Sequence, residues 1–593
     1  MTDEHGTEHA AAQHEVAQPP VGGQNARPTE GGDVGVRHVA ILAVLVALLA
    51  GALLSLSGER RTPTAPFARG TRIAIASCSE AATQAGIEAF ENGGNVVDAA
   101  VAVTFAISVT CPESTGMGGG GFFLVHDART GEVEALDARE VAPVSARADM
   151  YRRGHPEDST DGPNAVAVPG LVAGALDLHK RRGSKPLKEL LAPAIRLARS
   201  GFPVGAHLAH ASEARAAVLA HDPEAAKIFL HRGKPLALGE LLVQTDLANL
   251  LEAIATGSSL SDPPFAKAIA KGTNNVVSPE DVIAYEVKHR TPVRGTYRGH
   301  EIVSFPPCSS GGPILIEMLN VLETFSLDGL PAGARAHLLV ETMRRAYRDR
   351  SEYLGDPDVV SVPVKGLVSK ATARELAATI DRDHATPSYA LKPGPAPAHE
   401  SDHTVHFTVV DSAGNAVSST QTINTYFGSC VVAPGIGVLL NNEMDDFSRG
   451  PGEANAYGLI QGEANAIGPI KRPLSSMTPT FVFDGKELSL ALGSPGGSKI
   501  ITAVLQVLVN RLDLDLDPRE AVAAPRIHHQ WLPDRVEAER ETDPDVIRDL
   551  QERGHKVELV GPGTDVQAVF RDAPGGTLTA VSDPRFEGAP AAR

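Results

Sequence analysis

The sequence predicts a fold that mixes α-helices and β-strands, and three observations carry this prediction. From residue 71 onward, short apolar runs of strand length alternate with longer runs of helical periodicity. The pattern of residues 160–400 indicates mostly helices. Residues 402–423 form two alternating runs around a turn-forming segment, which is the pattern of a β-hairpin. With 593 residues, 42% of them hydrophobic, the chain is long enough to bury a large core.

The composition argues against several classes of partner and cofactor. A net charge of −18 leaves no basic stripe for nucleic-acid phosphates, and Trp531 is the single tryptophan available to stack on bases. The four cysteines are far apart, without a Cys-x-x-Cys pair or a histidine at zinc spacing, so no structural metal is expected. Cys78 and Cys111 either form a disulfide, if the chain is exported, or stay as buried thiols. We therefore expect small molecules as partners.

The N-terminal part of the chain divides into three segments. Residues 1–37 are rich in Gly, Glu, His, Gln and Pro without apolar periodicity, and we expect a disordered tail. Residues 38–57 contain an uncharged apolar run at the lower length limit for spanning a bilayer. We expect a single transmembrane helix, with a cleaved signal as the alternative, because the preceding tail is long and no Ala-x-Ala motif ends the run. Residues 58–70 contain prolines and form a linker.

The globular part is expected to begin with a strand and two helices. Residues 72–76 are an apolar run of strand length, and residues 80–91 have helical periodicity that stops at two glycines. Asn95 is suited to cap a second helix at residues 96–109. Asp98 lies in the first turn of that helix, where a carboxylate interacts favourably with the helix dipole.

A glycine-rich run at residues 116–121 precedes strands expected at residues 122–126 and 133–137. The run lacks the Gly-Lys-Ser/Thr ending of a phosphate-binding loop and opens a strand instead of a helix. These glycines are better suited to let two backbones pass close together beneath a pocket.

Arg139 follows the second of these strands, and its position has two interpretations. The first is an ion pair with a neighbouring carboxylate, Asp137 or Glu140. The second is a planar fork that grips a substrate carboxylate, a task for which a guanidinium is better suited than an ammonium.

The middle of the chain ends in a proline-rich segment. Residues 385–400 contain four prolines and little periodicity, which indicates an exposed linker directly before Thr404. Such a linker suits a site where the chain is cut and its new end moves away. The other expected elements are helices at residues 168–180, 188–199, 244–256, 314–324, 334–353 and 499–509, and strands at residues 297–305 and 488–492.

Thr404 lies in the first strand of the expected hairpin. Thr404, His406 and Thr408 fall on one face of this strand, and Val405 and Phe407 fall on the other. A β-branched residue in a strand ordinarily packs or pairs, so the position alone does not indicate catalysis. The following segments change this interpretation, because they are rich in small hydroxyls, carboxylates and paired glycines. They are TQTINT at residues 420–425, NNEMDDF at 441–447, KRPLSSM at 471–477 and GSPGGS at 493–498.

At these segments the sequence resembles the γ-glutamyltransferases, a family of N-terminal-nucleophile hydrolases that mature by cutting themselves. The resemblance runs from about residue 70 to the C-terminus. It implies a four-layer αββα sandwich, in which two antiparallel sheets lie between helical layers. It also implies one catalytic domain assembled from a large-subunit segment, residues 71–403, and a small-subunit segment, residues 404–593, which form a heterodimer after cleavage.

The resemblance makes Thr404 the nucleophile, and the chemistry of the residue agrees with that role. Attack of its hydroxyl on the carbonyl of His403 gives an ester, and water then separates the two segments. The new α-amine of Thr404, with a pKa of about 7.7–8.0, lies next to its own hydroxyl and serves as the base. The second threonine of the family corresponds to Thr422, on the neighbouring strand of the hairpin.

The remaining site residues match family positions residue by residue. A γ-glutamyl donor carries an α-ammonium and an α-carboxylate at one end and the scissile amide at the other. The implied ammonium ligands are Asn424, Glu443 and Asp446, and the implied carboxylate ligands are Arg139, Ser475 and Ser476. The implied oxyanion donors are Gly496 and Gly497, and Tyr457 is the implied closing residue of a lid at residues 451–470. Without the resemblance, the acidic segment would be a solvated turn and the glycine pair an ordinary tight turn.

The expected function is glutathione hydrolysis and γ-glutamyl transfer to the amine of an amino acid or peptide, through an acyl-enzyme at Thr404. No metal or organic cofactor is expected. More arginines follow residues 38–57 than precede them, which by itself would keep the catalytic part inside, but long domains cross the membrane largely regardless of such counts. The resemblance implies export, so the anchored catalytic part is expected on the periplasmic or extracellular side of the membrane. One alternative is an acylase for another amide, such as a glutaryl-β-lactam or poly-γ-glutamate. A second is an anchored binding protein without catalysis, which the intact Thr404, Thr422 and glycine pair disfavour.

Overall fold

The computed structural model describes residues 64–593, except 152–154, 156, 392–403, 449–453, 457, 460 and 573–574. The expected tail and transmembrane helix lie outside the described residues, as do His403 and Tyr457. Within the described part of the chain, no helix is long and apolar enough to cross a membrane.

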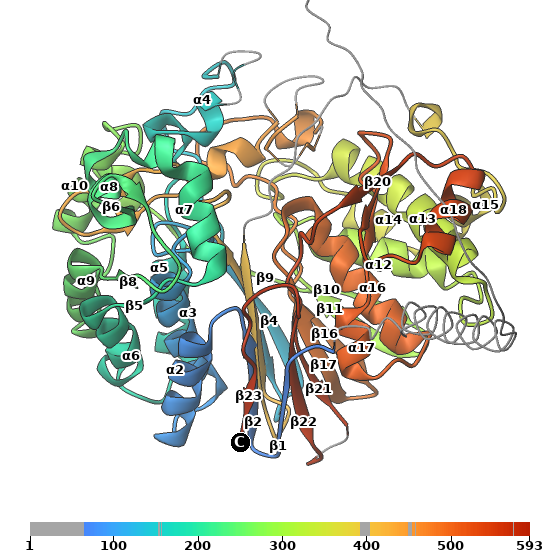
Figure 1. The fold of residues 1–593 in the computed structure, drawn as a ribbon, viewed down its shortest axis with the longest axis horizontal. Coiled ribbons are helices and arrows are strands. Elements are labelled where there is room, and N and C mark those ends of the chain that lie inside the picture. The colour runs from blue at the N-terminus through green and yellow to red at the C-terminus, as the bar shows by residue number, and fades with distance from the viewer. Residues whose placement is uncertain are drawn as a thin grey trace, which may run out of the picture. The chain divides into compact units, whose positions relative to one another are not determined.

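Two seven-stranded sheets form the centre of the catalytic unit (Figure 1). The neighbouring strands within each of them pair in antiparallel fashion. One sheet has the order β1 (Phe67–Gly70), β22 (Leu578–Ser582), β21 (Gln567–Arg571), β17 (Glu487–Gly493), β16 (Thr480–Asp484), β11 (His300–Ser304) and β10 (Val293–Tyr297). The other has the order β23 (Ala591–Ala592), β2 (Ile73–Ser77), β12 (Val405–Asp411), β13 (Ala416–Thr422), β3 (Gly120–Asp127), β4 (Glu132–Ala138) and β9 (Lys288–Arg290).

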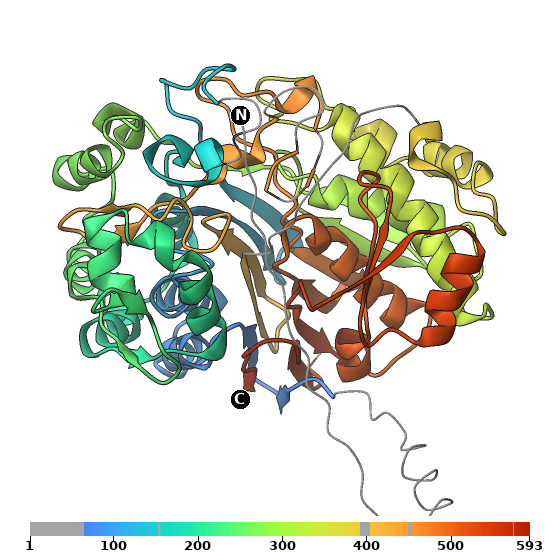
Figure 2. The same ribbon diagram turned by 45° about the horizontal axis from the view of Figure 1, so that its top comes forward.

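The two sheets pack face to face through a buried apolar layer. Phe122 of β3 and Phe305, next to β11, stack in this layer with ring centroids 4.1 Å apart. The outer face of the β12 sheet is covered by α2 (Glu80–Glu91), α3 (Val96–Thr110) and α5 (Leu171–Arg182), and α6 (Leu187–Ser200) packs against α3. The outer face of the β17 sheet is covered by α12 (Gly311–Leu322) and α16 (Ile500–Leu512), and α13 (Ala332–Tyr353) packs against α12. Figure 2 shows the resulting order of layers, helix, sheet, sheet and helix, which confirms the expected α and β architecture.

Other helices and a small sheet flank these layers. The helices are α4 (Glu157–Thr160), α7 (Ala206–Leu219), α8 (Pro223–Phe229), α9 (Thr245–Ala255), α10 (Pro263–Gly272), α11 (Pro279–Ile283), α14 (Val364–Leu367), α15 (Lys370–Ala378), α17 (Pro518–Ala523) and α18 (Pro544–Glu552). The small sheet consists of β18 (Ile527–His528), β19 (Val536–Glu539) and β20 (Val557–Val560).

Local capping signals fix the helices that support the site. The Asn95 side chain accepts hydrogen bonds from the backbone of Val97 and Asp98, and Asp98 returns one to the Asn95 N–H. This capping box starts α3 where the sequence predicted it. The side chains of α3 are apolar nearly all round, so the helix lies buried between the β12 sheet and its neighbouring helices.

Two sequence predictions are corrected by the structure. The strand expected at residues 297–305 is confirmed only as β11, because Arg298 (φ 51°) and Gly299 (φ 89°) form a turn that joins β11 to the preceding strand β10. The linker expected to be exposed at residues 385–400 is packed where it begins. Ser388 is buried, donates its N–H to Asp534 and accepts a hydrogen bond from the Trp531 indole.

Candidate active site

Thr404 lies directly before β12, a strand between β2 and β13 in the middle of its sheet. Its Oγ1 is 3.5 Å from Oγ1 of Thr422, at the end of the paired strand β13. The Thr422 hydroxyl also accepts a hydrogen bond of 2.8 Å from the Asn424 backbone. The hairpin register therefore brings together the two threonines that the sequence singled out, and Thr404 is only 7% exposed.

Gly496 and Gly497 lie between β17 and α16, and each of them lines a cavity that Thr404 also lines. Their φ angles are 127° and 51°, values that side chains rarely allow. A Cβ on Gly496 would lie 2.5 Å from the Gly563 carbonyl oxygen. The pair leads into a helix N-terminus, whose free N–H groups carry partial positive charge. Backbone N–H groups of this kind have the chemistry that a developing oxyanion requires.

Arg139 is fully buried at the end of β4 and belongs to a network of charges. Its guanidinium donates to the carboxylates of Glu443 and Asp446, and its Nε donates to the Pro473 carbonyl at 3.1 Å. Burial alone lowers the pKa of Arg139, but the charges of Glu443 and Asp446 outweigh it and raise the pKa above its usual range. The guanidinium therefore stays charged.

The expected ion pair between Arg139 and its sequence neighbours is found only in part. Glu140 lies 3.4 Å from the Arg139 guanidinium. Asp137 instead accepts the backbone N–H of Arg139 and pairs through its side chain with Arg290 and Arg472. Because Asp137 has other cations as partners, it does not compete for the guanidinium of Arg139.

Glu443 and Asp446 bound the 3-10 turn Glu443–Asp446 and are both buried. Burial raises the pKa of Glu443 well above its usual range, although the neighbouring guanidinium of Arg139 opposes this. The second oxygen of Glu443, Oε2, has no hydrogen-bond partner among the described residues. A buried acceptor of this kind is suited to bind an ammonium group.

A small cavity of about 20 Å³ joins these groups to the nucleophile. It is lined by Thr404, Thr422, Arg139, Asn424, Glu443, Asp446, Ser475, Ser476 and Gly497, together with Arg350 and four apolar residues. Apart from Tyr457 and His403, which lie outside the described residues, and Gly496, every sequence-predicted site residue lines this cavity. Cationic and anionic side chains thus lie within one pocket at Thr404.

Arg350 is the charged residue in the lining of this cavity that the sequence did not indicate. It projects from α13, is 2% exposed, and donates to the hydroxyls of Ser310 and Ser476 at 2.9 and 3.1 Å. Its Nη1 has no hydrogen-bond partner in the described part of the chain. Burial lowers the pKa of Arg350 to about 10, so the group still carries its charge near neutral pH.

The glycine-rich run at residues 116–121 lies beneath this site. Its close contacts with neighbouring backbone explain why these positions are glycines. A Cβ on Gly118 would lie 2.1 Å from the carbonyl oxygen of Leu439, and one on Gly119 would lie 1.9 Å from that of Thr422. Only glycine lets the start of β3 approach the backbone of Thr422 so closely. The prediction that backbones pass close together here is confirmed.

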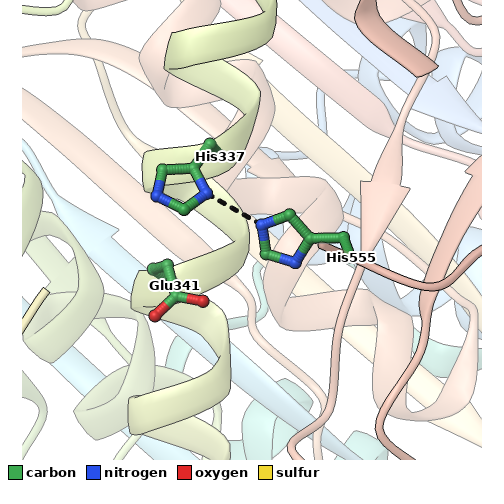
Figure 3. Close-up of side chains that lie close together, drawn as sticks. All are labelled: His337, Glu341 and His555. Carbon is green, nitrogen blue, oxygen red and sulfur yellow. Dashed lines mark hydrogen bonds between the residues drawn. The ribbon is translucent and has the colours of Figure 1, made fainter. Parts of the chain in front are cut away.

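A cluster of His337, Glu341 and His555 has the composition of a metal site (Figure 3). The first two residues project from α13, and His555 lies between α18 and β20. His337 Nδ1 and His555 Nε2 share a hydrogen bond of 2.8 Å, and Glu341 pairs with Arg344 and Arg345. Because these ligand atoms already have partners and two cations lie beside the carboxylate, we assign no metal to the cluster.

Cys78 and Cys111, the pair that the sequence left open, are free thiols in the structure. Their Sγ atoms lie 3.0 Å apart. Cys308 and Cys430 are also free and are buried.

Comparisons with known proteins agree with this geometry. The family model Gamma-glutamyltranspeptidase matches residues 82–593. The glutathione hydrolase proenzyme of Escherichia coli (strain K12) is 42% identical over 575 residues, covering 93% of this chain and 97% of that protein. The Acylase ACY 1 proenzyme of Pseudomonas sp. (strain V22) is 37% identical, covering 88% of this chain and 94% of that protein. The crystal structure of cephalosporin acylase from Bacillus halodurans has a TM-score of 0.80 and 27% identity, covering 91% of this chain and 98% of that one.

Proposed function

We propose that this chain, an enzyme that belongs to the γ-glutamyltranspeptidase family, cuts itself before Thr404 and then uses that residue to hydrolyse glutathione and transfer its γ-glutamyl group. The observation that carries the proposal is the small cavity in which Thr404 lies among carboxylates and arginines. These are the groups that a substrate with both an ammonium and a carboxylate requires.

Self-cleavage begins with attack of the Thr404 hydroxyl on the preceding carbonyl. Water hydrolyses the resulting ester and frees the α-amine of Thr404, which then acts as the base for its own hydroxyl. The products are a large segment that ends at His403 and a small segment, residues 404–593. Strands from both segments alternate in one sheet, since β12 pairs with β2 and β13 pairs with β3, so the segments stay together as a heterodimer.

The donor binds with its α-amino acid end in the small cavity. Glu443, Asp446 and the Asn424 side chain receive the ammonium, and Ser475, Ser476 and the arginines receive the carboxylate. The ammonium and the carboxylate of the substrate replace part of the ion pairing between Arg139 and the carboxylates of Glu443 and Asp446. Tyr457 and the lid that it belongs to close over the donor, which limits access of water.

The acyl transfer runs through a tetrahedral intermediate at Thr404. Gly496 and Gly497 supply N–H groups to its oxyanion, where each donor contributes on the order of 3 kcal/mol to lowering the barrier. The amine half of the donor then leaves. Water or a second amine attacks the acyl-enzyme and restores the Thr404 hydroxyl. We also propose that residues 38–57 anchor the enzyme with its catalytic part on the periplasmic or extracellular side. The membership of the family supports this side, whereas the arginines that follow the segment would by themselves favour the inside.

A second candidate is an acylase for another amide, because relatives with acylase names align with most of the chain. The two functions differ in what the donor carries at its α-carbon. A glutaryl donor has no ammonium and gains nothing from Glu443 and Asp446. Rates with γ-glutamyl-p-nitroanilide and glutaryl-p-nitroanilide separate the candidates: the proposed function requires the γ-glutamyl compound to be the better donor, and the reverse order would support the acylase.

Arg350→Gln is expected to weaken donor binding by about 10- to 100-fold in kcat/KM, mainly through KM, because a hydrogen bond to a charged group contributes about 1.5–3 kcal/mol. The amide nitrogen of glutamine corresponds in position to Arg350 Nε, which donates to Ser310, so the substitution keeps this donor but removes the charge that faces the cavity. The measurement compares γ-glutamyl-p-nitroanilide with 4-aminobutyryl-p-nitroanilide, which lacks the α-carboxylate and is expected to be insensitive.

Arg348→Gln, on the same helix but outside the cavity lining, is the matched control. An equal loss for both donors in Arg350→Gln would show that the residue only positions Ser476 and does not receive the carboxylate.

A further inference from the structure

The backbone turn that carries Gly496 and Gly497 is held by a tyrosine from another part of the chain. The turn consists of residues 496–498, between β17 and α16, and we call it the glycine turn. The hydroxyl of Tyr347, on α13, donates a hydrogen bond to the carbonyl oxygen of Ser498. Because Tyr347 is 1% exposed and Ser498 is 2% exposed, this hydrogen bond is shielded from water.

A second side chain restrains the same turn. The Ser498 hydroxyl donates to the side-chain oxygen of Gln530 at 2.6 Å, and this oxygen shares a hydrogen bond of 3.0 Å with the ring of His528. The ring of Tyr347 packs edge-on against the ring of His528, with the centroids 5.5 Å apart and the planes at 87°. The tyrosine is thus fixed at its ring as well as at its hydroxyl, so it offers the turn a rigid support.

The glycine turn needs support from other side chains because its two glycines have none of their own. Their φ angles of 127° and 51° lie in a region that glycine enters at low cost and also leaves at low cost. A donor lowers the barrier only if its N–H already points at the position of the oxyanion, about 2.7–3.1 Å away, before the reaction starts. A contact that holds the carbonyl of Ser498 limits how far the neighbouring peptide groups can rotate.

Helix α13 supports the donor cavity as well as the glycine turn. Arg350 lies three residues after Tyr347, on the same face of the helix, and donates to the hydroxyls of Ser310 and Ser476. Ser476 lines the small donor cavity. Tyr347 lines neither that cavity nor the larger one, of about 510 Å³, that Thr404 also borders. Tyr347 therefore influences the reaction through the residues that it holds, without touching the substrate.

We propose, on the basis of the function proposed above, that Tyr347 is a positioning residue that fixes the glycine turn for the oxyanion. Formation and breakdown of the acyl-enzyme both pass through a tetrahedral intermediate, so the same support serves both steps. A fixed N–H donor binds the oxyanion more strongly than it binds the planar carbonyl of the bound donor, and so it lowers the barrier without tightening substrate binding. Loss of the Tyr347 hydroxyl is therefore expected to lower kcat and to leave KM nearly unchanged.

The test uses Tyr347→Phe, which removes one hydroxyl and keeps the ring that packs against His528. With γ-glutamyl-p-nitroanilide as donor, and with protein that intact mass shows to be processed, we expect kcat to fall about tenfold and KM to stay within about twofold of wild type. Tyr297→Phe is the matched control. Tyr297 is also buried and its hydroxyl donates to Asp513, but it lines neither cavity, so its variant should keep the wild-type kcat.

A second variant tests the same support from the other side of the turn. Ser498→Ala removes the hydrogen bond to Gln530 and keeps the carbonyl that Tyr347 holds. Because one of two restraints remains, kcat is expected to fall by about threefold, again with KM nearly unchanged. If Tyr347→Phe does not fold or is not processed, the same comparison of kcat and KM is made with Ser498→Ala.

A transition-state analogue distinguishes support of the turn from support of the donor cavity. 2-Amino-4-boronobutanoic acid, the boronic acid analogue of the donor, binds as a tetrahedral anion on the Thr404 hydroxyl. Its Ki should rise in each variant by the factor by which kcat/KM falls. L-Glutamate fills the donor cavity without forming a tetrahedral anion, so its Ki should stay at the wild-type value.

Two results would overturn this inference. One is a kcat for Tyr347→Phe, or for Ser498→Ala in its place, that equals the kcat of Tyr297→Phe. The other is an equal loss of affinity for the boronic acid and for L-glutamate, which would show that the side chain only supports the donor cavity. If the processed wild type hydrolyses the donor while either result is obtained, only the inference about the glycine turn fails. If the processed wild type does not hydrolyse the donor at all, the proposed function fails.

Discussion

Thr404→Ala is expected to leave the chain uncut and to reduce donor turnover by roughly 10⁴-fold or more, because the substitution removes the atom that forms both covalent intermediates. The side chain lies directly before a central strand and contacts the Thr422 hydroxyl at a distance of 3.5 Å, so the fold should tolerate its loss. Intact mass under denaturing conditions reports cleavage, and release of p-nitroaniline from γ-glutamyl-p-nitroanilide reports turnover.

Thr404→Ser is the matched variant, since it keeps a hydroxyl and an α-amine at the same position. It should still cut itself and retain measurable activity, although more slowly than wild type. If Thr404→Ala still separated into two segments, another nucleophile would be responsible for the cleavage and the mechanism above would be wrong.

Arg139→Lys is expected to lower kcat/KM for γ-glutamyl donors by about 10²- to 10³-fold, since truncating one member of a buried charge network costs roughly 2–5 kcal/mol. Lysine keeps the charge but loses the planar fork that reaches Glu443, Asp446 and the Pro473 carbonyl together. Steady-state kinetics on the processed protein measure the effect, and intact mass confirms that processing has occurred.

Arg181→Lys serves as the control, because Arg181 forms its ion pairs with Glu134 and Asp177 near the surface, outside the cavity lining. This variant should match wild type. Unchanged kinetics in Arg139→Lys would mean that the point charge alone suffices, and that the donor does not depend on the geometry of the guanidinium.

Local features of the fold could be predicted from the sequence because they depend on residues close together in the chain. The capping box of Asn95 and Asp98 fixed the start of α3, and the alternating pattern around Thr404 fixed the two faces of β12. The hairpin of β10 and β11 was missed because Arg298, at the first position of its turn, is not a typical turn residue. A left-handed conformation there is imposed by the pairing of the strands on either side.

The site could be predicted only where the segments resemble a known family. Arg139 is about 300 residues from Glu443 and Asp446, and no sequence pattern links them. They meet because their segments converge on one end of the β12 sheet. Arg350 was missed because α13 carries many charged residues, and the sequence does not tell which of them are buried.

The central claim is that Thr404, as a new N-terminal residue, carries the γ-glutamyl group during turnover. The most direct measurement is the mass of the proteolytic peptide that begins at Thr404, isolated after acid quenching of the processed enzyme during its reaction with a γ-glutamyl donor in the absence of acceptor. The account predicts a peptide that starts at Thr404 and is heavier by one glutamyl group, with fragmentation that places the group on the threonine. A whole chain that contains no such N-terminus, or a glutamyl group attached to a different residue, would contradict it.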